Sequence, residues 1–136
     1  EIHWRDWSSD VCSSDLKLSA LCAASTAAMG AGAAITWLLG GDERQIGYCI
    51  NNMIGDVSGI ICDGAGSACS MKVSTSTSAA IKASLMAVNN LGVTQSEGIV
   101  ASTVDETIAN LGRLSRQGML DTDVEIINIM RAKQNP

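Results

Sequence analysis

The chain has 136 residues, with 14 acidic and nine basic side chains and a net charge of −5. No stretch concentrates Lys and Arg, which excludes a basic nucleic-acid-binding face, and the single His, His3, lies among the first residues. The remainder of the chain therefore cannot by itself build a Ser-His-Asp or Cys-His catalytic site or a His-ligated metal centre. The length suffices for one small domain. Ala, Gly, Ser and Thr dominate residues 19–87, and such small side chains allow helices to pack closely.

Residues 1–16 differ in composition from the rest of the chain, since they hold two of the three Trp residues and a Ser/Asp alternation. The run from Asp6 to Leu16 matches the in-frame translation of a short-read sequencing adapter, and the composition changes sharply at Lys17. We therefore expect residues 1–16, including Cys12, to be a non-native tail. An ordinary polar tail is the alternative. Without these residues the net charge is −2.

The segment from Leu18 to Leu39 contains no charged residue. By length it could span a bilayer, but it is rich in Ala, Gly, Ser and Thr and lacks a flanking aromatic belt or basic cluster. We predict a buried helix of small residues that ends at Gly40 and Gly41, and no membrane span.

A second helix is expected after Asp42, which can cap its first turn. Cys49 belongs to its apolar stripe, where the simplest interpretation is a small buried hydrophobe. The stripe follows helical spacing along Ile46, Cys49, Ile50, Met53, Ile54 and Val57.

The segment Ile60–Cys69 breaks the helical period, and its glycines predict a tight loop. A third helix is expected from Cys69 to near Gly92, and the Ser and Thr residues at 74–78 are expected to bond to backbone or neighbouring helices rather than to a ligand. Two capping boxes, at residues 103–106 and 122–125, predict two more helices separated at Gly118. No run alternates like a strand, so the predicted fold class is all-α.

The cysteines outside the tail lie among small-residue helices, and no secretory signal is recognisable, which indicates a reducing compartment. Clustered cysteines there bind metal more often than they form disulfides. The six residues between Cys62 and Cys69 do not match the spacing of a zinc knuckle, so the spacing alone does not identify a metal site. Free structural thiols and a zinc site are both alternatives at this point. A glycine loop between these thiols frees N–H groups, Cys69 begins a helix, and Lys72 adds positive charge. Cys22, in another small-residue helix, could pack beside the loop.

Five runs carry a family resemblance. CAASTAAMGAGAAITWLLGG, which starts at Cys22, is similar to the glycine- and alanine-rich segment of the L-cysteine desulfidase family, which is related to the alpha domain of iron–sulfur L-serine dehydratases. NMIGDVSGIICDGA, which starts at Asn52, and CSMKVST, which starts at Cys69, resemble its second signature. GIV at residues 98–100 and TIANLG at residues 107–112 resemble its C-terminal end. The resemblance implies that residues 17–136 are the C-terminal part of such a domain.

The resemblance also implies a cytoplasmic lyase with a [4Fe–4S] cluster held by Cys22, Cys62 and Cys69. It implies that Lys72 faces the substrate carboxylate and that Asp63 and Gly64 belong to the same substrate-binding signature. The expected reaction is α,β-elimination of L-cysteine to pyruvate, ammonia and sulfide, with L-serine dehydratase or a non-catalytic helical module with structural thiols or zinc as alternatives.

Two departures from the family pattern bear on these expectations. Gly66 stands where the family usually has Lys, which removes a positive charge beside the expected cluster. The N-terminal half that family members have is absent from this sequence. In the family, that half carries further substrate-binding residues. In the desulfidase branch it also carries a cysteine, which could replace Cys69 as the third ligand. The expected partners are an amino-acid substrate and that missing half, with a homodimer left open and neither nucleic acid nor membrane involved. The chain alone is expected to be inactive.

Overall fold

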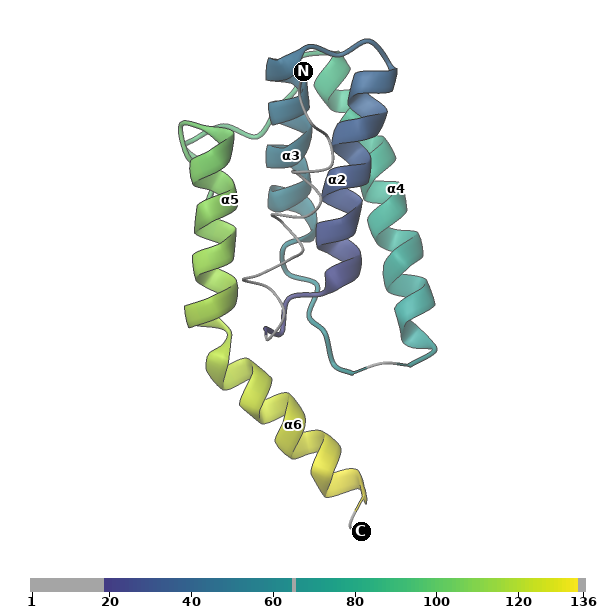
Figure 1. Cartoon of the computed structure of the whole chain (residues 1–136), viewed down its shortest axis with the longest axis vertical. Coiled ribbons are helices and arrows are strands. Elements are labelled where there is room, and N and C mark those ends of the chain that lie inside the picture. Colours follow the sequence, from purple (N-terminus) through teal and green to yellow (C-terminus); the bar gives the residue numbers. More distant parts are fainter. Residues whose placement is uncertain (1–18, 65, 135–136) are drawn as a thin grey trace.

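The computed structural model describes residues 19–64 and 66–134, and over these ranges the chain is helical with no strand (Figure 1). The all-α prediction is therefore confirmed, whereas the predicted tail and Cys12 lie outside the described residues. The elements in chain order are α2 (Ala23–Leu38), α3 (Glu43–Val57), α4 (Ala68–Val88), α5 (Val104–Arg113), the π-helical turn η1 (Leu114–Gly118) and α6 (Leu120–Gln134).

Helices α2, α3 and α4 form a three-helix bundle in which α2 and α4 begin at the same end and α3 runs the opposite way (Figure 1). The first helix begins later than predicted, because Ser19–Cys22 precede it in non-helical conformation and Cys22 is its extended N-cap residue. The predicted stop is confirmed, since Gly40 has a φ of +86°. Asp42 caps α3 in a capping box with Gln45, also as expected.

The bundle is held together by close contact between small residues. A Cβ on Gly32 of α2 would lie 3.0 Å from Cys49 Sγ and 3.6 Å from Ala80 Cα, and Ser84 Oγ donates to the Gly32 carbonyl at 2.9 Å. Cys49 is fully buried, which confirms its assignment to the core. The predicted α3 stripe is buried apart from Ile46, which is half-buried.

Helix α4 turns its small residues toward the bundle and leaves large apolar residues outside. Of the hydroxyls at residues 74–78, Thr77 bonds to the Val73 carbonyl at 2.8 Å, as predicted. Ser76 is buried, yet its Oγ has no hydrogen-bond partner among the described residues. The expectation of internal bonding is therefore confirmed for Thr77 and wrong for Ser76.

The C-terminal part begins as predicted and then departs from the prediction. Thr103 and Glu106 form the expected capping box, and the helix of α5 and η1 ends at Gly118. The second capping box is wrong, because α6 already begins at Leu120 and the Asp123 N–H bonds to the Met119 carbonyl at 2.9 Å, which places Thr122 inside the first turn. Helix α6 then projects beyond the bundle (Figure 1).

None of the helices between residues 19 and 134 combines the length and the hydropathy that a membrane span requires. This agrees with the prediction of a buried helix over the uncharged segment.

Candidate functional site

A short backbone contact joins the start of α2 to the loop that follows α3. Leu21 and Ile61 form an isolated antiparallel bridge. The Cys22 N–H donates to the Ile60 carbonyl at 3.0 Å, and the Cys62 N–H donates to the Ala20 carbonyl. Two of the three predicted cluster ligands are therefore held on either side of one bridge. Sequence periodicity gave no sign of this contact, and the prediction that Cys22 lies inside a helix is wrong because the residue adopts extended backbone to make it.

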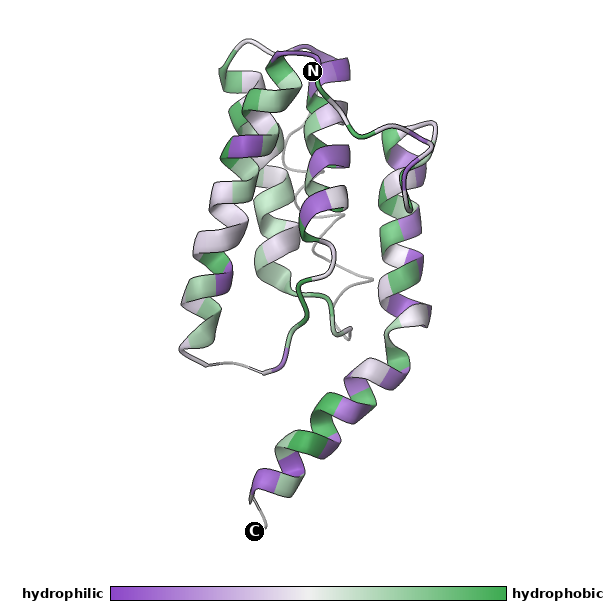
Figure 2. Ribbon diagram, turned by 180° about the vertical axis from the view of Figure 1, so that it is seen from behind, coloured by the Kyte–Doolittle hydropathy of each residue, from purple (hydrophilic) through white to green (hydrophobic). Residues whose placement is uncertain are grey.

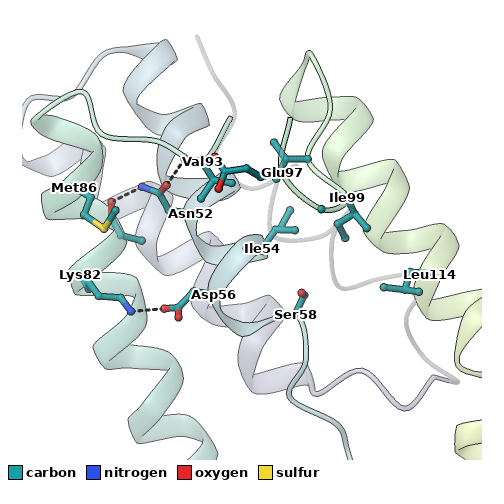
Figure 3. Close-up of a pocket in the computed structure, with 14 residues that line it drawn as sticks. Asn52, Ile54, Asp56, Ser58, Lys82, Met86, Val93, Glu97, Ile99 and Leu114 are labelled. Carbon is teal, nitrogen blue, oxygen red and sulfur yellow. Dashed lines mark hydrogen bonds and ion pairs between the residues drawn. The ribbon is translucent and has the colours of Figure 1, made fainter. Parts of the chain in front are cut away.

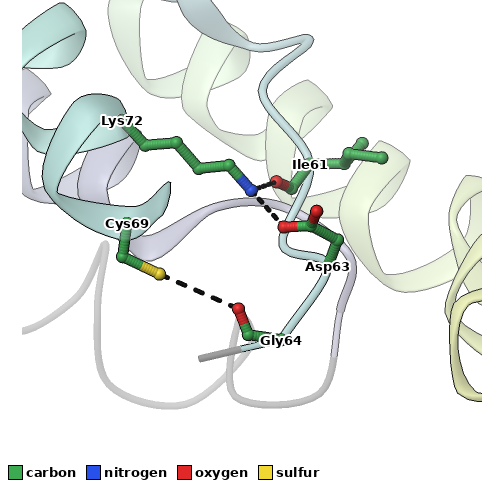
Figure 4. A network of polar contacts seen from close by, with 5 residues as sticks. All are labelled: Ile61, Asp63, Gly64, Cys69 and Lys72. Atoms are coloured by element: carbon green, nitrogen blue, oxygen red, sulfur yellow. Dashed lines mark hydrogen bonds and ion pairs between the residues drawn. The ribbon is translucent and has the colours of Figure 1, made fainter. Parts of the chain in front are cut away.

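The third predicted ligand, Cys69, is the second residue of α4 and closes the same loop from its far side. Its half-buried thiol donates to the Gly64 carbonyl at 3.8 Å (Figure 4). Cys22 is buried, Cys62 is exposed, and none of the three forms a disulfide. Because α2 and α4 begin at the same end of the bundle, the positive ends of two helix dipoles face this region.

Lys72 connects the loop to α4. Its Nζ donates to the Ile61 carbonyl at 2.9 Å and forms an ion pair with Asp63 (Figure 4). The hydrogen bond that Lys72 donates to Asp63 raises the pKa of Lys72, and the charges of Cys22 and Cys69 raise it further. The hydrogen bond from Lys72 in turn lowers the pKa of Asp63. The six predicted site residues therefore lie at the start of α2, in the loop after α3 and at the start of α4, with Cys62 beside Asp63 in the loop.

Gly64, the sixth, has a conformational and a packing role. Its φ of +103° belongs to the left-handed region that favours glycine, and a Cβ there would lie 3.0 Å from Met130 Cε. Lys133 also contributes to the lowered pKa of Asp63. Helix α6 therefore packs against the cysteine loop. The sequence analysis missed this contact, although the apolar residues of α6, which find few partners in the bundle, were a signal for it.

A second feature, a half-open groove of about 510 Å³, lies between α3, α4 and residues 93–100 (Figure 3). None of the predicted site residues lines it. Its Asn52 side chain is fully used, since Nδ2 donates to the Leu91 carbonyl at 2.9 Å and Oδ1 accepts from the Val93 N–H at 2.8 Å. Lys82 and Asp56 pair at 2.7 Å. Because these polar groups satisfy one another, the groove offers less chemistry than the cysteine loop.

The fit of the loop to a metal cluster depends on its donors. Within residues 19–64 and 66–134, no group of three or more Cys, His, Asp or Glu side chains is assembled to hold a metal ion. The donor chemistry is suitable, however, because three free thiols lie near two helix N-termini and a Lys. Ser25, one turn after Cys22, is fully buried with an unpaired hydroxyl. The thiols therefore fit an iron–sulfur cluster by type, and the ligand set stays a prediction.

Comparison with known proteins identifies the family of this helical domain. Residues 13–128 match the serine dehydratase alpha chain family, and the chain belongs to it. Over 118 residues it is 86% identical to UPF0597 proteins of Aeromonas hydrophila and Aeromonas salmonicida, a match that covers 87% of this chain and 27% of each relative. It is 57% identical over 117 residues to the UPF0597 protein YhaM of Escherichia coli O1:K1, covering 86% of the chain and 27% of that protein. The chain thus spans about a quarter of the length of these relatives. No solved structure matches it.

Proposed function

We propose that this chain is part of an iron–sulfur lyase that catalyses α,β-elimination of L-cysteine to pyruvate, ammonia and sulfide. The observation that carries the proposal is the convergence of the start of α2, the loop after α3 and the start of α4. Cys22 and Cys62 flank one backbone bridge, and Lys72 of α4 pairs with Asp63 of the loop. Membership of the serine dehydratase alpha chain family, which is generally associated with iron–sulfur enzymes, supports the same chemistry. Because the chain spans 27% of its relatives, the activity is proposed for the whole protein.

Cys22, Cys62 and Cys69 are the proposed ligands of a [4Fe–4S] cluster. When bound, a cluster with one iron free of cysteine supplies a Lewis acid for the leaving group or the carboxylate of the substrate. The chain's own contribution to ligand binding is a loop with Gly64 at positive φ and a cationic side chain, Lys72, beside it.

Lys72 and Asp63 are the proposed substrate-binding pair. An ammonium has three N–H donors, and Lys72 uses two of them, on the Ile61 carbonyl and on Asp63. The third donor is suited to the carboxylate of an amino acid. The Asp63 side chain is 59% exposed and carries a negative charge, so it is suited to the α-ammonium of the same substrate. The two side chains together would fix the amino-acid end and leave the β-substituent to the metal.

The overall reaction balances without an added oxidant or reductant. A base removes the α-proton, the Cα–H electron pair forms the Cα=Cβ bond, and the Cβ–S pair departs with sulfur as hydrosulfide. The aminoacrylate tautomerises to an imine, to which water adds, and this releases ammonia and pyruvate. Residues 19–64 and 66–134 contain no His, and we assign the base to the part of the family polypeptide that this chain does not contain.

L-Serine is the second candidate substrate, favoured by the description of the matched family. The same bonds would break, with water rather than hydrosulfide as the leaving group. A soft iron site accepts thiolate well, which is why L-cysteine is the first choice. Sulfide and pyruvate measured in parallel from both amino acids decide between them.

The test uses the full-length family protein that contains this sequence, reconstituted anaerobically with iron and sulfide. Cys22→Ala, Cys62→Ala and Cys69→Ala are compared with Cys49→Ala, a matched control because Cys49 is buried in the core on α3. We expect each of the first three variants to lose iron, acid-labile sulfide and the visible absorbance of the cluster, and the control to keep them. The assignment is wrong if all three variants retain the iron and sulfide of the parent protein. If Cys69→Ala alone retains them, another cysteine replaces it as third ligand.

A further inference from the structure

Two neighbouring helices, α2 and α4, are almost free of charge. No Asp, Glu, Lys or Arg occurs in α2, and α4 has only Lys72 and Lys82, which pair with Asp63 and Asp56. About a quarter of the residues in an average soluble domain are charged, and α3, α5 and α6 follow that pattern. In Figure 2 the most hydrophilic colour appears on α3, α5 and α6 but not on α2. The composition of α2 and α4 is therefore that of helices enclosed by protein.

Helix α4 is also apolar on its outside. Its bundle-facing side is made of small buried residues from Ser76 to Ala87, whereas Met71, Ile81 and Leu85 are 68%, 48% and 52% exposed. The outward stripe follows three- and four-residue steps along Met71, Ser74, Ser78, Ile81 and Leu85. Large exposed apolar residues on a helix whose other side is already packed are typical of a surface that meets a partner.

Helix α2 has a matching outer side that is made of exposed alanines and carries no large polar group. These residues follow the same helical steps along Ala23, Ala27, Ala31 and Ala34. Alanine stripes allow another helix to approach closely, and the protruding Met71, Ile81 and Leu85 of α4 would fit into grooves of such a partner. We call the α2 stripe and the α4 stripe together the α2/α4 outer face.

We infer that the α2/α4 outer face is the surface on which the rest of the family polypeptide docks. The argument for this occupant is chain length, because the curated relatives are long enough that this chain covers only 27% of each. The docked segment also reaches the site, because Met71 lies directly between Cys69 and Lys72 in sequence at the start of the α4 stripe.

The test measures the accessibility of single thiols introduced into the full-length family protein. Ser78→Cys on α4 is nearly isosteric, Ala31→Cys probes α2, and Ala109→Cys on α5 is the matched control, since all three positions are exposed in this structure. N-ethylmaleimide labelling under anaerobic conditions is followed peptide by peptide by mass spectrometry. We expect labelling at 31 and 78 to be roughly tenfold slower, or more, than at 109, because only local opening would expose them.

Equal labelling rates at all three positions overturn the inference. Protection that disappears on dilution to the monomer, monitored by light scattering, assigns the face to a second copy and also overturns it. If Ala31→Cys does not fold, Ser78→Cys alone decides the outcome. None of these readouts uses catalysis or the cluster, so failure here is distinct from failure of the proposed lyase activity.

Discussion

Two glycines of α2, two residues apart, should respond oppositely to the same substitution. Gly30 has no neighbouring atom within 4 Å of a built Cβ, whereas the Cβ of Gly32 would lie 3.0 Å from Cys49 Sγ. Gly30→Ala should raise the free energy of unfolding by about 1 kcal/mol, the usual gain in helix propensity. In Gly32→Ala the same gain is offset by overpacking that costs about 1–3 kcal/mol. The variant is therefore expected to be between unchanged and about 2 kcal/mol less stable.

The assay is urea unfolding of the 136-residue chain followed by far-UV circular dichroism. The double variant Gly32→Ala/Cys49→Ala removes the sulfur that the new methyl group would meet, so the two substitutions should show a favourable coupling of about 0.5–3 kcal/mol. A Gly32→Ala variant that is stabilised as much as Gly30→Ala, without coupling to Cys49, would refute the close packing of α2 against α3. That packing matters for function because α2 carries Cys22.

Two further predictions concern charged side chains. In the full-length protein, Lys72→Met should lower kcat/KM by about 10- to 150-fold, the equivalent of a charge-assisted hydrogen bond worth about 1.5–3 kcal/mol. The control is Lys82→Met, which removes a surface lysine paired with Asp56 and should leave kcat/KM unchanged. Equal effects of the two substitutions would contradict a role of Lys72 in substrate binding. Hydrogen bonds from Ser102 and Thr103 lower the pKa of Glu106 below its ordinary 4.5, so the folded state binds this proton less readily than the unfolded state. The contribution of Glu106 to stability is therefore present above pH 4.5 and is lost as the pH falls through the lower folded pKa. In Glu106→Gln, the free energy of unfolding measured with urea should depend less on pH over that range. An unchanged pH dependence in the variant would contradict the role of Glu106.

The local features of the fold could be read from the sequence. Asp42 and Thr103 begin helices because their side chains accept backbone N–H bonds within four residues, and the α3 stripe around Cys49 reports burial through helical spacing. Such signals are contained in short windows. The failure at Thr122 has the same origin, because the Thr-x-x-Glu pattern is equally compatible with a position inside a helix that started earlier.

The site depended on contacts between distant segments, and these could be predicted only in part. The loop around Gly64 and the thiols were recognisable from their residue types, and Lys72 was recognisable because it lies one turn after Cys69. The bridge between Leu21 and Ile61 was not predictable, because a single residue pair leaves no periodic pattern in the sequence. The packing of Met130 on Gly64 was also missed, since α6 is apolar on several sides and its sequence does not indicate which side meets the loop.

The bridge between Leu21 and Ile61 has a consequence for how the cofactor would be handled. Backbone hydrogen bonds hold Cys22 and Cys62 on either side of this bridge, so the chain itself positions these two residues. In zinc fingers, by contrast, metal binding and folding are one event. If the proposed cluster is present, a chain built in this way would receive it after folding. Replacement of a damaged cluster would then require new iron and sulfide but no refolding of the polypeptide.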